Sequence, residues 1–374
     1  MENNKEKVVL VRCKSYNLEE VKSSILSILE SLGGIRKFIS PKEKILIKPN
    51  LLSARTPEEG VTTHPSVVQA LAEIIIENRG IPYLGDSPSI ESFHKVITKT
   101  GMKKISMEKE IKIIPFEDPV NVDFKDGEFK KLEIAKPVLE FDKIINIAKL
   151  KTHTQFILTL GVKNMFGIVP GRRKAECHIR FGNDLFSFSK FLIDLYRFKK
   201  PVITILDGII GMDGNGPSNG RKRWFGIIMG SENAIALDTF ISYSLGIGNE
   251  YSIVKAGEKM GIKGSKIEDI EVLNGELFSI PDFKLPDSIP PSTRFSFLTS
   301  RLKSSLPRPF INRELCKLCK LCIEVCQTDS IKEDSKGLKI DYKNCISCFC
   351  CQEVCPYNAI EIKRGLLGKI LRRI

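Results

Sequence analysis

Residues 8 to about 275 alternate between short apolar runs and longer segments in which apolar residues recur at helical spacing. The short runs predict buried strands, whereas the helical spacing predicts amphipathic helices. The predicted strands occupy residues 8–13, 44–52, 81–88, 142–153, 201–210 and 223–230. The predicted helices occupy residues 17–34, 63–80, 184–198 and 233–245. Strands that alternate with helices indicate an α/β fold with a mostly parallel sheet covered by helices.

Local signals mark the ends of two of these helices. Asn17 is a candidate N-cap of the first helix, and glycines follow its last turn. Pro65 stands near the first turn of the second helix, and Gly80 follows its end. Both helices therefore have defined boundaries in the sequence.

Polar side chains follow four of the predicted strands, at the point where each strand ends. They are Lys48, Asn50, Asp86, Lys151, His153 and Asp207. In open α/β sheets the crevice beyond the carboxyl ends of the strands is the usual ligand site. We expect these residues to share one site, although polar residues also mark strand ends simply because loops begin there.

Residues 160–178, LGVKNMFGIVPGRRKAECH, form a basic segment punctuated by glycines. We expect a loop whose backbone amides and lysines wrap an anionic ligand. It contributes the candidate ligand-binding residues Lys163 and Asn164 and the candidate proton donor His178. It is not a P-loop, because the chain has no GxxxxGK[ST] motif.

Residues 211–220, GMDGNGPSNG, form a second glycine-rich segment. They lack the GxGxxG spacing, and a predicted strand follows where a dinucleotide fingerprint needs a helix, which argues against a Rossmann NAD site. Asp213 and Asn215 could coordinate a cation or a substrate hydroxyl, or only form a turn.

The chain has four histidines. His64 lies at a helix entrance, where it could bind substrate or cap the helix, and His94 is expected on a helix surface. His153 and His178 lie in the segments where lysines and glycines gather, and are the better site candidates. No HxH or HxxxH spacing supports a metal bound by these two with carboxylates.

Nine of the eleven cysteines lie between residues 316 and 355, a concentration typical of a metal site rather than of disulfides. The motif C-x2-C-x2-C-x3-C occurs twice, at an offset of 29 residues. In each motif three thiolates can bind the irons of one cubane while the fourth ligates the cluster of the other half. Eight thiolates in this order argue against zinc.

These repeats resemble the bacterial-type ferredoxin with two [4Fe–4S] clusters over residues 311 to 362. By that resemblance one cluster is held by Cys316, Cys319, Cys322 and Cys355. The other is held by Cys345, Cys348, Cys351 and Cys326. Gln327 replaces the usual proline of the first half. Cys350 is spare, either a small buried thiol or a residue that tunes or replaces a ligand.

A second resemblance covers roughly residues 40 to 240. The motifs IKPNLL, TTHP, GDSP, LKTH, LGVKNMFG, PGRRKAECH and LDGIIGMDGNGP occur in the order found in the family catalogued as domain of unknown function 362. The resemblance implies association with iron–sulfur clusters and redox chemistry, but no particular reaction. The family's recurring polar positions match Lys48, Asn50, His64, Asp86, Lys151, His153, Lys163, Asn164, His178, Asp207 and Asn215.

Composition and net charge limit the cellular location and the kinds of partner that we expect. The chain has 374 residues, 42% of them hydrophobic, and no apolar run long enough to span a bilayer. Its polar start lacks a secretory signal, so we expect a cytoplasmic protein. The net charge is +13, of which residues 301–374 carry +7. This excess favours an acidic electron-transfer protein or redox enzyme, an anionic small molecule or a membrane surface. No nucleic-acid-binding motif accompanies it.

Four segments are expected: an α/β domain (1–280), a proline-rich, semi-rigid linker (281–310), the ferredoxin domain (311–362) and a basic tail (363–374). As a helix the tail could rest on an anionic membrane, but its glycines favour a solvated, disordered segment.

Two functions fit these features. The first is an oxidoreductase, a reductase in which Lys48, Lys151 and Lys163 bind an anionic substrate, His153 or His178 supplies protons and the clusters supply electrons. Hydride-like chemistry would need a flavin or a further metal, for which no motif is visible. The second is a non-enzymatic electron carrier or a metallocofactor assembly protein.

Overall fold

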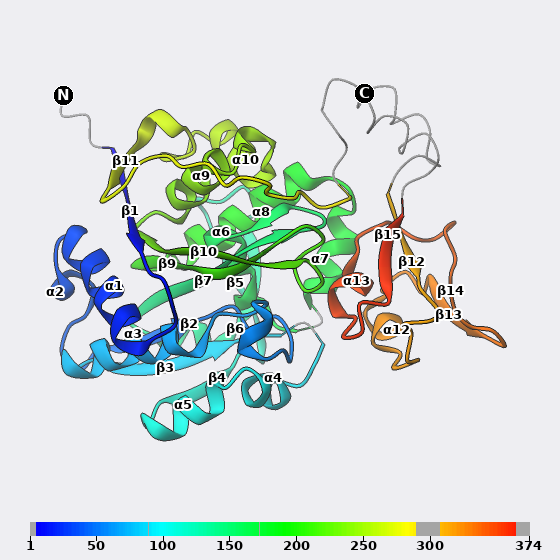
Figure 1. The fold of residues 1–374 in the computed structure, drawn as a ribbon, viewed down its shortest axis with the longest axis horizontal. Helices are drawn as coiled ribbons and strands as arrows, with labels where there is room; N and C mark the ends of the chain where they lie inside the picture. Colours follow the sequence, from blue (N-terminus) through cyan, green and yellow to red (C-terminus); the bar gives the residue numbers. More distant parts are fainter. Residues whose placement is uncertain (1–4, 89, 172, 289–306, 364–374) are drawn as a thin grey trace.

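Figure 1 shows the computed structural model, which describes residues 5–88, 90–171, 173–288 and 307–363. An α/β domain forms most of the chain, and a small C-terminal domain packs against one end of it. The middle of the predicted linker, residues 289–306, and the predicted basic tail beyond Lys363 lie outside the described residues.

The α/β domain is built on a nine-stranded sheet with the order β11-β1-β10-β9-β7-β2-β3-β4, and β8 pairs with β7. The strands are β1 (Glu6–Arg12), β2 (Lys44–Lys48), β3 (Ile81–Asp86), β4 (Lys112–Pro115), β7 (Lys143–His153), β8 (Ile157–Thr159), β9 (Ile203–Asp213), β10 (Arg221–Ser231) and β11 (Ile270–Leu273). The run from β4 to β9 is parallel, whereas β10 is antiparallel to both neighbours. The predicted mostly parallel sheet is confirmed.

Helices cover both faces of the sheet, because its strands alternate their side chains between two cores. In β2, Leu46 packs into one core and Ile45 and Ile47 into the other. One core includes α1 (Leu18–Ser31), α3 (Pro65–Glu77), α4 (Phe93–Lys99) and α5 (Met102–Glu108). The other includes α6 (Gly161–Asn164), α7 (Arg173–Phe181), α8 (Leu185–Phe198), α9 (Ala234–Ser244) and α10 (Ser252–Lys259).

Short elements complete this domain. They are α2 (Ile35–Phe38), the 3-10 turns η1 (Pro57–Glu59), η2 (Lys136–Glu140), η3 (Met165–Ile168), η4 (Gly248–Glu250) and η5 (Ile267–Asp269), and the hairpin of β5 (Pro119–Asp123) with β6 (Lys131–Ala135).

The predicted start of the first helix is confirmed. The Asn17 side chain accepts hydrogen bonds from the N–H groups of Glu19 and Glu20 at 3.1 and 3.2 Å. His64 caps α3 in the same way, since its Nδ1 accepts from the Ser66 N–H at 3.2 Å. These bonds satisfy N–H groups that have no partner inside a helix.

The loop expected over residues 160–178 is wrong, because α6, η3 and α7 occupy it. The buried carboxylate of Asp238, on α9, accepts hydrogen bonds from the N–H groups of Gly161 and Val162 at 2.7 and 3.1 Å. The first amides of α6 are therefore bound to a side chain of the protein itself instead of facing an external anion.

The C-terminal domain consists of two copies of one unit. It contains β12 (Arg308–Ile311) paired with β15 (Ile360–Lys363), the hairpin of β13 (Ile331–Asp334) with β14 (Gly337–Ile340), and the helices α12 (Leu321–Val325) and α13 (Cys350–Val354). Left-handed backbone conformations recur at the repeat offset, as in Leu318 with Ser347 and in Lys320 with Phe349. The repeat found in the sequence is therefore also a repeat of backbone conformation.

Candidate functional site between the two domains

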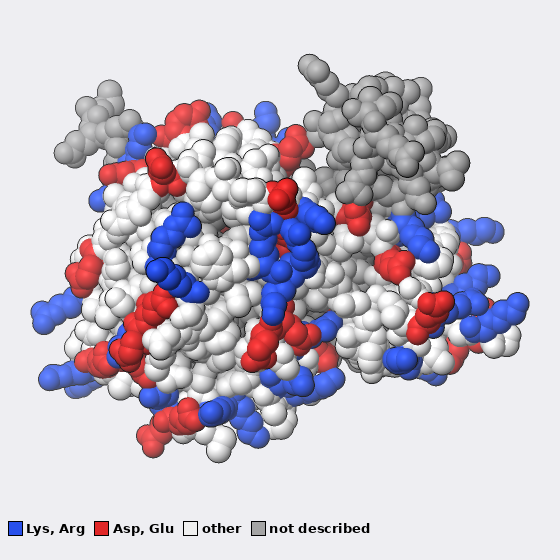
Figure 2. Space-filling view, viewed as in Figure 1, with Lys and Arg blue, Asp and Glu red and all other residues white. Residues whose placement is uncertain are grey.

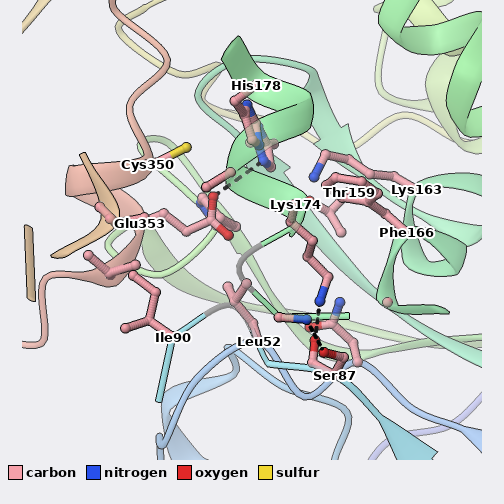
Figure 3. Close-up of a pocket in the computed structure, with 18 of the residues that line it drawn as sticks. Leu52, Ser87, Ile90, Thr159, Lys163, Phe166, Lys174, His178, Cys350 and Glu353 are labelled. Atoms are coloured by element: carbon pink, nitrogen blue, oxygen red, sulfur yellow. Dashed lines mark hydrogen bonds and ion pairs between the residues drawn. The ribbon is translucent and has the colours of Figure 1, made fainter. Parts of the chain in front are cut away.

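A pocket lies where the C-terminal domain meets the carboxyl ends of β2, β3 and β7 (Figure 3). Its empty volume is about 850 Å³, counting the part open to solvent, which is within the range of small-molecule sites. Both domains line it. The C-terminal domain contributes Glu324, Val325, Gln327, Cys350, Glu353 and Val354.

Seven of the eleven α/β candidates line this pocket. They are Asn50, Asp86, Lys151, His153, Lys163, Asn164 and His178. Lys174, which belongs to the basic segment 160–178 but not to the eleven candidates, lies with them, as do Thr159 and Phe166. The structure therefore brings together most of the predicted strand-end residues and the basic segment.

Lys151 is buried, and its ammonium group donates two hydrogen bonds to neighbouring residues. Its Nζ donates to Asn50 Oδ1 at 3.0 Å and to the Val61 carbonyl at 2.6 Å. Asn50 in turn donates from Nδ2 to Asn164 Oδ1 at 2.9 Å. Burial lowers the pKa of Lys151 to about 7, although the negative charge of Glu353 opposes this shift. Lys151 therefore changes its charge near neutral pH.

Two further lysines face the same space. Lys174 Nζ donates to the Ser87 carbonyl at 2.5 Å, and burial lowers its pKa to about 7. Burial also lowers the pKa of Lys163. The Lys163 ammonium lies 5.3 Å from the centre of the Phe156 ring, and within the described part of the chain no carboxylate forms an ion pair with it. Three lysines thus line one pocket, an arrangement that favours a negatively charged group there.

His153 is oriented by the backbone. Its Nδ1 accepts from the N–H groups of Gln155 and Phe156 at 3.1 and 3.2 Å, so the proton of the neutral ring resides on Nε2. Burial holds its pKa well below the usual value, so the ring is neutral. Among the described residues Nε2 has no hydrogen-bond partner, and a carboxylate oxygen of Glu353 lies 3.8 Å away.

Two more buried polar atoms on the lining residues are unsatisfied. His178 Nδ1 and Thr159 Oγ1 have no hydrogen-bond partner within the described ranges. Burial lowers the pKa of His178 to about 3. Buried polar atoms without partners cost free energy, which a bound polar ligand would recover. The pocket therefore offers hydrogen-bonding groups as well as positive charge.

Figure 3 shows how the two domains face each other across the pocket. Glu353 and Cys350 point in from the C-terminal domain, and Lys163 points in from the opposite wall. Lys174 points down toward Ser87. A ligand in this space would contact the lysines and the C-terminal domain at the same time.

Lys48 lies behind the pocket rather than in its lining. Its Nζ pairs with Asp86 Oδ1 at 2.9 Å, and both side chains are buried. The other Asp86 oxygen accepts from the Leu51 N–H at 2.8 Å. Lys48 thus neutralises Asp86 and holds it in position.

His64 and Asp207 lie in a separate buried network. Asp207 accepts from Tyr16 Oη at 2.8 Å, from Lys149 Nζ at 2.8 Å and from the His64 N–H at 2.9 Å. The His64 ring stacks on Tyr16 with the centroids 3.6 Å apart, and burial lowers the pKa of His64 to about 4. These bonds bind both oxygens of Asp207 to the protein.

Asn215 and its neighbours anchor the C-terminal domain. Its carbonyl accepts from Gln352 Nε2 at 2.9 Å, and Asn219 Nδ2 donates to the Gln352 carbonyl at 2.8 Å. Arg55 donates from Nη2 to the Cys355 carbonyl at 3.2 Å. Asn215 also bonds Asp287 within the predicted linker, and Asp213 pairs with Arg221 and Arg223.

The eight repeat cysteines fit two cubane sites. One set, Cys316, Cys319, Cys322 and Cys355, lines a single cavity. Burial raises the pKa of the Cys351 thiol, and the nearby thiols of Cys348, Cys345, Cys322 and Cys326 raise it further, so Cys351 lies close to the rest of its own set and to one cysteine of the other set. The backbone N–H of the fourth residue after Cys326 and after Cys355 donates to that sulfur at 3.3 Å in both repeats. Such bonds stabilise thiolate ligands.

Cys350 does not line the first cluster cavity but the interdomain pocket. Its thiol lies within hydrogen-bonding reach of Cys348. Gln327, which replaces the usual proline, lines the same pocket. The two departures from the ferredoxin pattern therefore meet at one place, where each adjoins a cysteine of the second set.

In the described ranges no three His, Cys, Asp or Glu side chains converge as ligands of a single metal ion, so His153 and His178 form no preassembled site of that kind. The helices that the structure describes include none long and apolar enough to cross a membrane. The cytoplasmic location stays a prediction.

The chain is similar to known proteins over both domains. It is 33% identical to a thylakoid-associated protein of Synechocystis sp. over 286 residues, which are 76% of this chain and 89% of that protein. A pyruvate synthase subunit, PorD, of Methanocaldococcus jannaschii is 43% identical over 54 residues, 14% of this chain and 63% of that subunit. The lactate racemase apoprotein of Thermoanaerobacterium thermosaccharolyticum aligns with 64% of this chain and 57% of its own, with a TM-score of 0.40 and 12% identity.

Family models match the two domains separately. The model of the 4Fe-4S dicluster domain matches residues 307–359, which identifies the C-terminal domain as an iron–sulfur electron-transfer domain. The model described as domain of unknown function (DUF362) matches residues 45–242. The chain thus belongs to the DUF362 family, and a ferredoxin-type dicluster domain follows its family domain.

Proposed function

We propose that the protein is an oxidoreductase that exchanges electrons between two [4Fe–4S] clusters and an anionic small molecule in the interdomain pocket. One observation carries the proposal: the three lysines line a pocket whose other wall is made by the ferredoxin-type domain itself. Cys350 and Gln327 in that wall are adjacent in sequence to Cys351 and Cys326 of the second cysteine set. A ligand bound by the lysines would lie beside a cluster.

The clusters, when bound, supply one electron at a time at low potential. The remaining chemistry belongs to side chains of the α/β domain. Lys163 and Lys174 attract and orient the anionic group, and Lys151 can add a third interaction. His153 presents Nε2–H to the ligand, and His178 can accept or donate at Nδ1. Burial keeps both rings neutral, so they can hydrogen-bond the ligand, whereas Lys151, whose pKa is lowered to about 7, is the group suited to deliver protons as electrons arrive.

Analysis of protein purified without oxygen tests the proposal. We expect about eight irons per chain and a small anion released on denaturation. We also expect sulfate, as a probe anion, to raise the melting temperature of the native protein. Lys163→Gln should reduce that rise, whereas Lys200→Gln, at an exposed position after α8, should leave it unchanged.

Two results together would count against an oxidoreductase. The first is intact protein that contains its irons but releases no anion, and the second is an equal sulfate-dependent shift of the melting temperature in both variants. With both results, the pocket is not an anion site. The protein would then be an electron carrier or an assembly protein without a small-molecule substrate.

A further inference from the structure

The two cysteine loops are equivalent in the repeat but have opposite surroundings. The first loop, residues 316–322, includes the exposed Cys319, and Leu318 in it is 46% exposed. In the second loop, residues 345–351, the position equivalent to Lys320 is Phe349, which is only 6% exposed. The difference in exposure matches the sequences at these equivalent positions, which are KLCK in residues 317–320 and ISCF in residues 346–349.

The α/β domain docks on the side of the second loop. Cys350, in the second loop, lines the interdomain pocket, and the next residue after this loop, Gln352, bonds Asn215 and Asn219. The cavity enclosed by Cys316 and its three partners is instead lined, among the described residues, by the C-terminal domain alone. The α/β domain reaches the first set only through the bond of Arg55 to the Cys355 carbonyl among the bonds described above. The second set, adjacent in sequence to the pocket residues Cys350 and Gln327, lies beside the pocket, so we call it the inner set and the first set the outer one.

A patch around the outer loop has the composition of a transient protein contact. We call it the entry surface, and it consists of Leu315, Lys317, Leu318, Cys319, Lys320 and Tyr357. The three apolar members are between 43 and 46% exposed. Lys320 pairs with Glu333 at 2.7 Å, whereas no ion pair of Lys317 occurs in the described part of the chain. Figure 2 shows basic side chains, with acidic ones among them, at the end of this domain far from the α/β domain, where Figure 1 places β13 and β14.

We propose that the entry surface docks an acidic one-electron carrier protein. In each encounter the carrier loses one electron, and the outer cluster gains it. Electron-transfer complexes are small and weak, and complementary charge sets their rate of association. The first cysteine loop is exposed and carries both apolar side chains and lysines, so it suits a small, weak complex with an acidic protein. The proposal rests on the two-cluster assignment within the proposed function but is independent of the ligand in the pocket.

The test uses full-length protein with its clusters and a fully reduced acidic flavodoxin as the probe carrier. Stopped-flow absorbance follows cluster reduction. At low salt Lys317→Glu should lower the second-order rate constant about fivefold, and the difference should disappear at high salt. Lys200→Glu has the same charge change at an exposed site of the α/β domain and should have no effect. Reduction by dithionite should be equal in all variants.

A second readout does not depend on electron flow. A carbodiimide should link Lys317 or Lys320 to carboxylates of the flavodoxin, and mass spectrometry identifies the linked residues. Equal rate constants for the Lys317 and Lys200 variants, cross-links confined to the α/β domain, or cross-links between two copies of this chain would each overturn the proposal. The sulfate-dependent rise in melting temperature, measured on the same wild-type protein, tests the pocket alone, so a failure of the entry surface is distinguishable from a failure of the pocket.

Discussion

His153 of the α/β domain and Glu353 of the ferredoxin-type domain face each other across the domain boundary, with His153 Nε2 3.8 Å from Glu353 Oε2. The Glu353 charge also acts on Lys151 and Lys163, since it raises the pKa of each against the larger effect of burial. The Glu353 carboxylate thus lies among the groups that would bind an anion, so it would compete with a bound anion for the lysines.

We therefore expect Glu353→Gln to increase the affinity for small anions. Removing one negative charge a few ångströms from the lysines should strengthen sulfate binding about fivefold, or about 1 kcal/mol at the high effective dielectric of a partly open pocket. Calorimetric titration with sulfate measures it. Glu324→Gln is the matched control, because Glu324 lines the same pocket from an exposed position. A loss of affinity in Glu353→Gln would contradict the competition.

Sulfate binding should weaken as the pH rises through about 7. Burial lowers the pKa values of Lys151 and Lys174 to about 7, so both are charged below this pH and neutral above it. Sulfate keeps its own charge over this range, so the change reports the protein. Titration between pH 6 and 8 should show the decrease (roughly tenfold if one lysine charge is lost). Lys174→Met should flatten the profile, and an equally steep profile in that variant would exclude Lys174.

The lowered pKa values of Lys151 and Lys174 also affect the stability of the fold, which should increase as the pH rises, whereas sulfate binding should weaken. In the unfolded chain these lysines keep their protons up to about pH 10.4, so between pH 7 and that value the unfolded state binds more protons than the folded state. The free energy of unfolding should rise with pH over this window. Replacement of Lys174 by methionine should reduce the slope of denaturant-derived free energies against pH. A slope unchanged by this replacement would contradict the lowered pKa.

Cys350→Ala should retain the iron of the wild-type protein, about eight atoms per chain. Cys350 lines the interdomain pocket, and the eight repeat cysteines suffice for two cubanes. Cys351→Ala, one residue further, removes a ligand of the inner set and should reduce the iron to about four. Iron and sulfide analysis of anaerobically purified protein measures both. Equal losses in the two variants would make Cys350 a ligand.

Asp238→Ala should destabilise the α/β domain by about 2–4 kcal/mol, because it leaves two buried N–H groups of α6 without an acceptor. Asp184→Ala is the matched control. Asp184 caps α8 through the Ser187 N–H at an exposed position, and its loss should cost about 1 kcal/mol. Denaturant unfolding of full-length protein compares them, and equal costs would show that burial of the Asp238 bonds is unimportant.

Much of the α/β fold follows from hydrophobic periodicity, and rules for strand ends locate Asn50, Asp86, Lys151 and His153. The separation of Asp207 from these residues could not be predicted. The pairing of β7 with β9 shifts register between Lys149 and Lys151, so two lysines two residues apart have different partners. Lys149 pairs with Asp207, and Lys151 bonds Asn50.

The other unpredicted part of the pocket comes from tertiary contact. Glu353 and Cys350 face the lysines only because Gln352 and Arg55 tie the two domains together. No local pattern encodes such a contact. Gln327 is the signal that the sequence offered, because it departs from the ferredoxin pattern beside Cys326 and lines the pocket.

The buried second loop has a consequence for how the chain can be divided. Phe349, Cys350 and Cys351 are between 6 and 8% exposed. A ferredoxin-type domain cut from this chain would expose to solvent whatever part of that surface the α/β domain now covers. Under the proposed function electrons would cross a wall common to both domains, so a domain cut from this chain would lose part of the surroundings of its second cysteine set.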